Sequence, residues 1–151
     1  LKYIMRDDPE ETIGIVLVHD AARCFAPAEL FSTVTERVRT IMSQNVAAGV
    51  VPALPVVDTI KMVDSSGNVL GTPDRTRLRR VQTPQGFDAK LLWTLHQEAR
   101  KEGLSTTDDA ALLEKFQFGV ATVPGDEKAL KITTPTDLRL AQFIMEEDAE
   151  G

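Results

Sequence analysis

The segment 19–23 (His-Asp-Ala-Ala-Arg) places a carboxylate and a guanidinium on either side of two small residues. Asp20 can orient a substrate hydroxyl or approach a metal-bound phosphate, and Arg23 can bind a phosphate through two parallel hydrogen bonds. The two alanines allow a ligand to come close to the backbone. The same spacing is also typical of an aspartate that caps a loop and pairs with a surface arginine. His19 is more typical of a packed histidine than of a catalytic base.

A second candidate site lies at residues 131–135 (Lys-Ile-Thr-Thr-Pro). Lys131 stands near the end of an expected strand, and the hydroxyls of Thr133 and Thr134 follow just before an expected helix start. Helix N-termini attract anions through unpaired N–H groups and the helix dipole, and lysine adds a mobile full charge. The segment therefore predicts an anion site, although a plain helix cap beside an exposed lysine has the same residues.

A third candidate combines Arg75 with Thr83, which follows it by eight residues. Pro84 and Gly86 predict a fixed turn that presents Thr83 and Gln85. Taken alone, this pattern is typical of an ordinary loop.

No loop that could hold a nucleotide triphosphate is visible in the sequence. Such a loop is usually glycine-rich, because its backbone N–H groups surround the phosphates. The nine glycines are scattered, none forms a Gly-x-Gly pair, and no Walker motif is present. We therefore expect an anion site without a nucleotide cradle.

The first third of the chain predicts a strand, a helix and a second strand. Residues 14–18 form a short, continuously apolar run typical of a buried strand of a parallel sheet. Pro27 opens a helical pattern, and residues 47–54 resemble the first run. Ligands bind beyond the carboxyl ends of strands in such sheets, which is where segment 19–23 lies. The apolar positions that predict the helix are Leu30, Val34, Val38 and Ile41.

Residues 56–76 predict a β-hairpin with its turn at residues 64–68. Ile60, Met62, Val63 and Leu70 have no obvious local core to bury them. A projecting arm that packs on a partner subunit would bury these side chains. A hairpin folded back on its own sheet would do the same, and the sequence leaves both arrangements open.

The rest of the chain continues the alternation of strands and helices. We expect strands at residues 79–82, 118–123 and 130–133. We expect helices capped by Asp88 and ended by Gly103, capped by Thr107, and begun at Thr134 with a capping-box pattern. The last helix has an apolar stripe of Leu138, Ala141 and Met145. These elements predict one α/β domain over residues 1–151, with three α/β/α layers, a mainly parallel sheet and a projecting hairpin arm.

Composition narrows the class of protein. The net charge of −6 and an aromatic content of 5% disfavour a nucleic-acid-binding module. No apolar run approaches the length of a membrane span, and no signal peptide is visible. Cys24 is the single cysteine and cannot form an internal disulfide, so we expect a cytoplasmic protein. No metal ligand set stands out.

Five segments, taken in order, resemble the methylerythritol-phosphate cytidylyltransferases of the non-mevalonate route to isoprenoid precursors. The resemblance runs from about residue 15 to about residue 144, nearly the whole chain. Each motif is modest, but five in this order are specific. The segments are residues 19–23, 55–61 (Pro-Val-Val-Asp-Thr-Ile-Lys), 82–87 (Gln-Thr-Pro-Gln-Gly-Phe), 107–110 (Thr-Asp-Asp-Ala) and 131–135.

The resemblance implies a Rossmann-like nucleotidyltransferase domain and a homodimer. The implied reaction joins CTP and 2-C-methyl-D-erythritol 4-phosphate and releases pyrophosphate, with Mg²⁺ bound mainly through the CTP phosphates. It also implies site residues. The methylerythritol phosphate would be held by Asp20, Arg23, Thr107 and Thr133, and by Thr59, Arg75 and Thr83 reaching it from the hairpin region of the other subunit. Arg75 and Lys131 would be catalytic, Lys131 would also contact the α-phosphate, and Ala21 would lie near the ribose.

The sequence departs from the family pattern in two places. Cys24 stands where the family usually has proline. The N-terminal segment with the glycine-rich loop is missing, so we expect a truncated chain that is inactive alone. Two alternatives remain: a ribitol-5-phosphate cytidylyltransferase, and a non-catalytic dimerising or phosphate-binding remnant.

Overall fold

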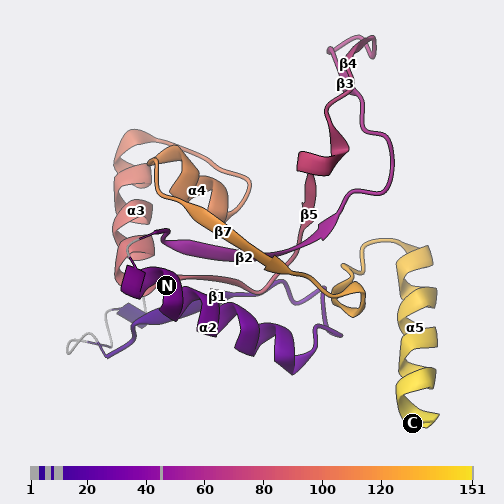
Figure 1. The fold of residues 1–151 in the computed structure, drawn as a ribbon, viewed down its shortest axis with the longest axis horizontal. Coiled ribbons are helices and arrows are strands. Elements are labelled where there is room, and N and C mark those ends of the chain that lie inside the picture. Colours follow the sequence, from indigo (N-terminus) through magenta and orange to yellow (C-terminus); the bar gives the residue numbers. More distant parts are fainter. Residues whose placement is uncertain (1–3, 6–7, 9–11, 45, 151) are drawn as a thin grey trace.

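The computed structural model describes residues 4–5, 8, 12–44 and 46–150. Helices and strands alternate along the chain (Figure 1). The main sheet contains β1 (Ile15–Val18), β2 (Gly49–Pro55), β5 (Arg79–Val81), β6 (Gln85–Asp88) and β7 (Val120–Pro124), and a hairpin contains β3 (Met62–Val63) and β4 (Val69–Gly71). The helices are α2 (Ala28–Gln44), α3 (Ala89–Glu102), α4 (Asp109–Lys115) and α5 (Pro135–Glu150), with short 3₁₀ turns η1 (Arg75–Arg77) and η2 (Glu127–Ala129).

The main sheet is mixed rather than mainly parallel in its pairing. Strands β1, β2 and β7 run in one direction, and β7 pairs in parallel with β2. Strand β6 lies between β1 and β2 and is antiparallel to both, with Leu17 and Val50 on either side of Gly86. Strand β5 continues antiparallel along the same edge of β2. The prediction of mainly parallel pairing is therefore wrong. Residues 85–88, which were expected to belong to a turn, form the antiparallel strand β6.

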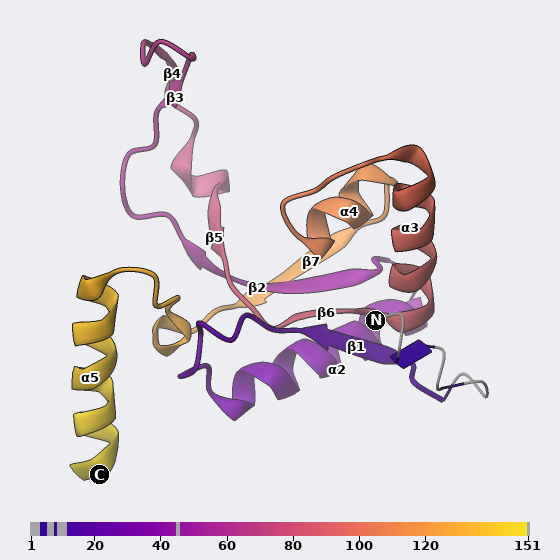
Figure 2. The ribbon, with the colours of Figure 1, turned by 180° about the vertical axis from the view of Figure 1, so that it is seen from behind.

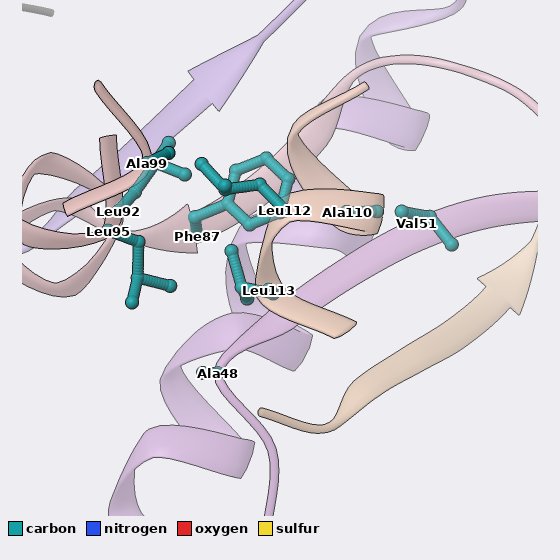
Figure 3. Close-up of a cluster of buried hydrophobic side chains, with 9 residues drawn as sticks. All are labelled: Ala48, Val51, Phe87, Leu92, Leu95, Ala99, Ala110, Leu112 and Leu113. Atoms are coloured by element: carbon teal, nitrogen blue, oxygen red, sulfur yellow. The ribbon is translucent and has the colours of Figure 1, made fainter. Parts of the chain in front are cut away.

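Helices cover both faces of this sheet, which confirms the three-layer architecture. Helix α2 lies on one face, and α3 and α4 lie on the other (Figures 1 and 2). Each face has its own buried apolar cluster. On the α3–α4 face, Phe87 is fully buried among leucines of both helices (Figure 3). On the other face, α2 buries the four residues that its spacing predicted: Leu30, Val34, Val38 and Ile41.

Gly86 allows α2 to lie directly on β6. A Cβ atom at this position would be 2.6 Å from Cγ1 of Val34 and 2.8 Å from Cγ2 of Val38. Such distances are well inside van der Waals contact, so a side chain would push the helix away from the sheet. The glycine that predicts a turn is therefore a packing residue in a strand.

The capping residues of the central helices are largely those predicted. Oδ1 of Asp88 accepts a hydrogen bond from the backbone N–H of Leu91 at the start of α3, and Gly103 ends that helix at φ 65°. Helix α4 is capped by Asp108, whose carboxylate accepts from the N–H of Ala111. The prediction that Thr107 caps this helix is wrong by one residue.

Helix α5 begins as predicted but stands beside the sheet rather than on it (Figures 1 and 2). The preceding segment, residues 130–133, lies outside any strand, so the predicted strand there is wrong. Of the expected stripe, Ala141 is buried, whereas Leu138 and Met145 are exposed.

The hairpin arm (residues 56–76) leads away from the body and carries β3 and β4 at its tip (Figures 1 and 2). It does not fold back on its own sheet. Met62, Val63, Val69 and Leu70 are all more than half exposed. Among the described residues, no helix is long and apolar enough to cross a membrane.

Candidate functional site

The loop after β1 and the loop after β7 meet beyond the carboxyl ends of these strands. The backbone N–H of Ile132 donates to the carbonyl of Ala22 at 2.9 Å, which ties the two loops together. We call the residues brought together here, Asp20, Arg23, Thr83 and Lys131, the Asp20–Lys131 corner. Its position follows the rule that open α/β sheets bind ligands beyond the carboxyl ends of their strands.

Asp20 and Lys131 form an ion pair in this corner. Nζ of Lys131 lies 2.7 Å from Oδ2 of Asp20, and both side chains remain partly exposed, 47% for the lysine and 37% for the aspartate. The hydrogen bond from Lys131 lowers the pKa of the Asp20 carboxyl; burial raises it, and the positive charges of Lys131, Arg23 and His19 lower it further. The pair thus presents a carboxylate and an ammonium to solvent side by side.

Thr83 joins the corner through its hydroxyl. Oγ1 of Thr83 accepts a hydrogen bond from the backbone N–H of Asp20 at 3.0 Å and lies 3.0 Å from Nδ1 of His19. The His19 ring packs against Phe31 with centroids 4.9 Å apart. Thr83 therefore lies beside Asp20 of its own chain, which corrects the expectation that it arrives from a second subunit.

Arg23 points inward rather than toward a free phosphate site. Its Nη1 donates to the carbonyl of Ala129 at 2.6 Å, and Nη2 donates to the carbonyl of Val81 at 3.5 Å. Burial lowers the pKa of this guanidinium, while the charge of Asp20 raises it. Nε is buried and finds no partner among the described residues. Arg23 therefore links its own loop to the backbone at Val81 and at Ala129.

The N-terminus of α5 is already occupied by a carboxylate of the helix itself. Oδ2 of Asp137 accepts hydrogen bonds from the N–H and hydroxyl of Thr133 and from the N–H of Thr134, and the N–H of Asp137 donates to the Thr134 hydroxyl. These bonds, led by that of the Thr133 N–H, lower the pKa of Asp137 to about 2. The predicted anion site at this helix end is thus filled by its own capping box, and Thr133 serves the cap.

Thr107 and Ala21 are exposed at the same edge of the sheet as the corner. Nε2 of the buried Gln85 donates to Oδ2 of Asp108 at 3.0 Å, which holds the start of α4 near β6. Gln85 is the register partner of Val18, the last residue of β1. Thr107 therefore stands next to the end of β1, and Ala21 lies in the turn that follows Asp20.

Thr59 and Arg75 belong to the arm and not to the corner. Thr59 is exposed in the loop that precedes β3, and the guanidinium of Arg75 donates to the carbonyl of Val57 in the arm itself. The arm to which both residues belong leads away from the sheet in both views (Figures 1 and 2).

A groove of about 640 Å³ opens beside the corner, between η2 and α5. Its lining combines cationic and apolar side chains with the carboxylates of Glu127 and Asp137, and Arg23 and Lys131 contribute to its wall. The groove can therefore accept a small molecule that carries both an anionic group and a carbon skeleton. The apolar contributions come from Leu54, Val81, Leu130, Leu140, Phe143 and Ile144.

Two polar residues in or near the corner were not predicted as site residues. His19 contacts Thr83, and Gln82 is buried below the corner with its side-chain amide bonded to the loop after β7. Both stand in segments that the sequence marks, but the bonds join residues far apart in the chain, so no local spacing announces them. Among the described residues, no group of three or more His, Cys, Asp or Glu side chains could hold a metal ion.

The sequence matches the family model for 2-C-methyl-D-erythritol 4-phosphate cytidylyltransferase over residues 7–147. It is 51% identical over 130 residues to the cytidylyltransferase of that name from Microcystis aeruginosa, covering 86% of this chain and 55% of the relative. It is 49% identical over 136 residues to that of Nocardia farcinica, covering 90% and 55%. The chain spans about half the length of the curated relatives it matches.

Two solved structures share the fold over more than nine tenths of this chain. The 2-C-methyl-D-erythritol 4-phosphate cytidylyltransferase of Thermus thermophilus superposes with a TM-score of 0.76 at 37% identity, covering 93% of this chain and 66% of that one. The 4-diphosphocytidyl-2C-methyl-D-erythritol synthase of Anaerococcus prevotii gives a TM-score of 0.81 at 30% identity, covering 96% and 64%. The expected nucleotidyltransferase-like fold is therefore confirmed.

Proposed function

Because this chain belongs to the 2-C-methyl-D-erythritol 4-phosphate cytidylyltransferase family, we propose that it serves the transfer of CMP from CTP to 2-C-methyl-D-erythritol 4-phosphate, with release of pyrophosphate. The observation that carries this proposal is the Asp20–Lys131 corner, where a carboxylate, an ammonium and a threonine hydroxyl converge beyond the strand ends. A polyol phosphate has hydroxyls that can donate hydrogen bonds to the carboxylate, and a phosphate that can pair with the ammonium.

Lys131 and Asp20 have different roles because their charges are opposite. The ammonium of Lys131 neutralises negative charge that accumulates between the attacking phosphate and the α-phosphate, and this stabilisation is strongest for a charge held in a fixed position. Asp20 accepts a hydrogen bond from a substrate hydroxyl and keeps the lysine in place before substrate arrives. Thr83, fixed by the Asp20 N–H, adds a further hydroxyl. Thr107 and Ala21 are exposed at the same edge of the sheet.

The arm supplies the remaining predicted groups in a homodimer. Its exposed apolar side chains favour burial against a second subunit, because burying apolar surface is the main driving force of association. In such a dimer Thr59 and Arg75 of one chain reach the corner of the other, and Arg75 orients the attacking phosphate. Arg23 holds the corner together from below and contacts substrate only if it gives up its backbone partners.

Magnesium belongs to the proposal through the nucleotide. Mg²⁺ prefers oxygen ligands and is commonly bound by phosphates together with one or two carboxylates. The described residues offer no acidic cluster for a metal ion, so the ion would be held mainly by the phosphates of CTP. When bound, the ion neutralises phosphate charge. The single, exposed Cys24 fits a reducing compartment, and the cytoplasm is the proposed location.

A chimera tests this proposal at the level of the residues described here. Residues 7–147 of this chain replace the matching region of the Microcystis aeruginosa relative, and pyrophosphate release is measured with CTP, Mg²⁺ and either 2-C-methyl-D-erythritol 4-phosphate or ribitol 5-phosphate. We expect release with the methylerythritol phosphate and at most a tenth of that rate with ribitol phosphate, about 1.4 kcal/mol of discrimination.

Two results would contradict the proposal. Equal or faster reaction with ribitol phosphate would assign the corner to the other polyol phosphate. A folded chimera that binds CTP yet releases no pyrophosphate with either substrate would favour a non-catalytic role for this chain.

A further inference from the structure

Gln82 is a buried polar residue that lies directly before Thr83, and only 4% of its surface is exposed. Its backbone N–H donates to the carbonyl of Pro52 at 2.8 Å, so the residue is fixed to the central strand β2. A buried amide needs hydrogen-bond partners for both of its ends, since leaving one unpaired is costly. The partners it finds show what it does.

Both ends of the Gln82 amide bind the loop that carries Lys131. Nε2 donates to the carbonyls of Asp126 at 2.8 Å and Ala129 at 3.3 Å, and Oε1 accepts from the N–H of Asp126 at 3.0 Å. The carbonyl of Ala129 also accepts from Nη1 of Arg23. One side chain from the sheet thus fixes η2 at two points, and Arg23 joins it at the second.

Gly125 is fitted to this amide. A Cβ atom at Gly125 would stand 2.3 Å from Oε1 of Gln82 and 3.2 Å from the backbone carbon of Ala53, so the amide could not keep its place beside any larger residue. The close approach from the loop and the paired amide from the sheet are two independent features of the same contact.

The loop between β7 and α5 otherwise has little regular structure to hold it. It contains η2, and it is outside the sheet until α5 begins. Lys131 stands two residues after Ala129, and its Nζ must reach Oδ2 of Asp20. The position of the ammonium therefore depends on where the Ala129 backbone is held on one side, and on the bond of the Ile132 N–H to the Ala22 carbonyl on the other.

We propose that Gln82 is a positioning residue, which, with Gly125 fitted against it, holds the η2 loop so that Lys131 meets Asp20. The local geometry stands by itself, whereas its consequence for catalysis rests on the proposed function. Neither Gln82 nor Gly125 contacts substrate in this account; both act through Lys131.

The pKa of the Asp20 carboxyl, measured by carbon-13 NMR in the 151-residue chain, reports whether Lys131 is in place. Lys131→Gln removes the ammonium and defines the largest upward change expected in the pKa of Asp20. Gln82→Met and Gly125→Ala both leave the net charge unchanged and disturb the contact from opposite sides. We expect each to produce at least half of the change caused by Lys131→Gln. His19 and Arg23 also face Asp20, and every variant keeps both of these side chains.

Gln85→Met is the matched control, because Gln85 is equally buried but binds Asp108 in place of the η2 loop. It should leave the pKa of Asp20 at the parent value. If Gln82→Met does not fold, Gly125→Ala decides the matter. A folded variant of either kind with the parent pKa for Asp20, or an equal change in Gln85→Met, would overturn the proposal.

In the chimera, Gln82→Met should lower kcat at least tenfold and leave KM for CTP unchanged. An unchanged kcat beside a raised Asp20 pKa would contradict the catalytic consequence. An inactive parent chimera would contradict the proposed function instead, and the NMR result would still decide the role of Gln82.

Discussion

Nζ of Lys131 lies 2.7 Å from Oδ2 of Asp20, although these residues come from opposite ends of the chain. Asp20 follows β1, and Lys131 follows β7. The sheet brings these two strand ends to the same edge, and Arg23 and Gln82 hold the connecting loops there. The pair is partly exposed, so its use in binding and its contribution to stability can be measured separately.

Lys131→Gln should cost little stability. Exposed ion pairs contribute about 0–1 kcal/mol, and we expect a change within that range in urea unfolding at pH 7. The folded state lowers the pKa of Asp20, so any stabilisation is present above the unfolded pKa of about 3.9 and is lost as pH falls through the folded pKa. Parent and variant should therefore converge at low pH. Lys101→Gln, which breaks the exposed pair with Glu98, is the control. A difference that persists in acid would show that Lys131 stabilises the fold by another route.

Gly86→Ala should destabilise the chain by about 1–3 kcal/mol, the usual cost of overpacking. The added Cβ would enter the contact of Val34 and Val38 with β6. Gly14→Ala is the matched control, because nothing lies within 4 Å of a Cβ there. Both are measured by urea unfolding. Equal stability of the two variants would mean that α2 does not pack on Gly86 as described.

The carboxyl of Asp137 should titrate at about 2 in the folded chain. Three donors on residues 133 and 134 stabilise its charged form. Thr133→Val removes one of them, the Thr133 hydroxyl, so the pKa should move up toward the ordinary value of about 3.9. The hydrogen bonds of the cap are present above the unfolded pKa and are lost as pH falls toward 2, so amide exchange in the first turn of α5 should accelerate over that interval. A pKa of Asp137 that is the same in both chains would show that the capping box does not form.

Self-association of the chain should depend on the tip of the arm. Met62→Ser and Leu70→Ser replace side chains that are 53% and 67% exposed, so the monomer should keep its helix content and melting temperature. The double variant should shift sedimentation equilibrium toward monomer. Leu138→Ser on α5, where the leucine is 52% exposed, controls for loss of any surface apolar group. If only this control prevents association, the interface lies on α5.

Sequence patterns predicted the elements whose signals are local. The spacing of Leu30, Val34, Val38 and Ile41 predicted α2 with its buried face, and Asp88 and Gly103 marked both ends of α3. Strand β6 was missed because a glycine at position 86 is typical of a turn. The structure shows that a glycine is needed there because helix α2, distant in the sequence, packs against it.

In the candidate site, too, the sequence predicted features with local signals and missed those that depend on distant contacts. The motifs located Asp20 correctly at the end of β1 and identified Lys131 as a site residue, although Lys131 lies in the loop after η2 and not in the strand predicted at residues 130–133. The structure brings these two side chains together. The inward orientation of Arg23 was not predictable, because its acceptors, the carbonyls of Val81 and Ala129, belong to segments distant in the sequence. The anion site expected before α5 was filled by Asp137, a residue of the same capping motif that predicted the helix.

The most direct test of this account is a titration of the chain with 2-C-methyl-D-erythritol 4-phosphate, followed by calorimetry or NMR, in the parent, Lys131→Gln and Lys101→Gln. The account predicts that the parent and Lys101→Gln bind equally and that Lys131→Gln binds at least tenfold more weakly, a loss of about 1.4 kcal/mol. Equal binding by all three chains would contradict the assignment of the Asp20–Lys131 corner as the substrate site.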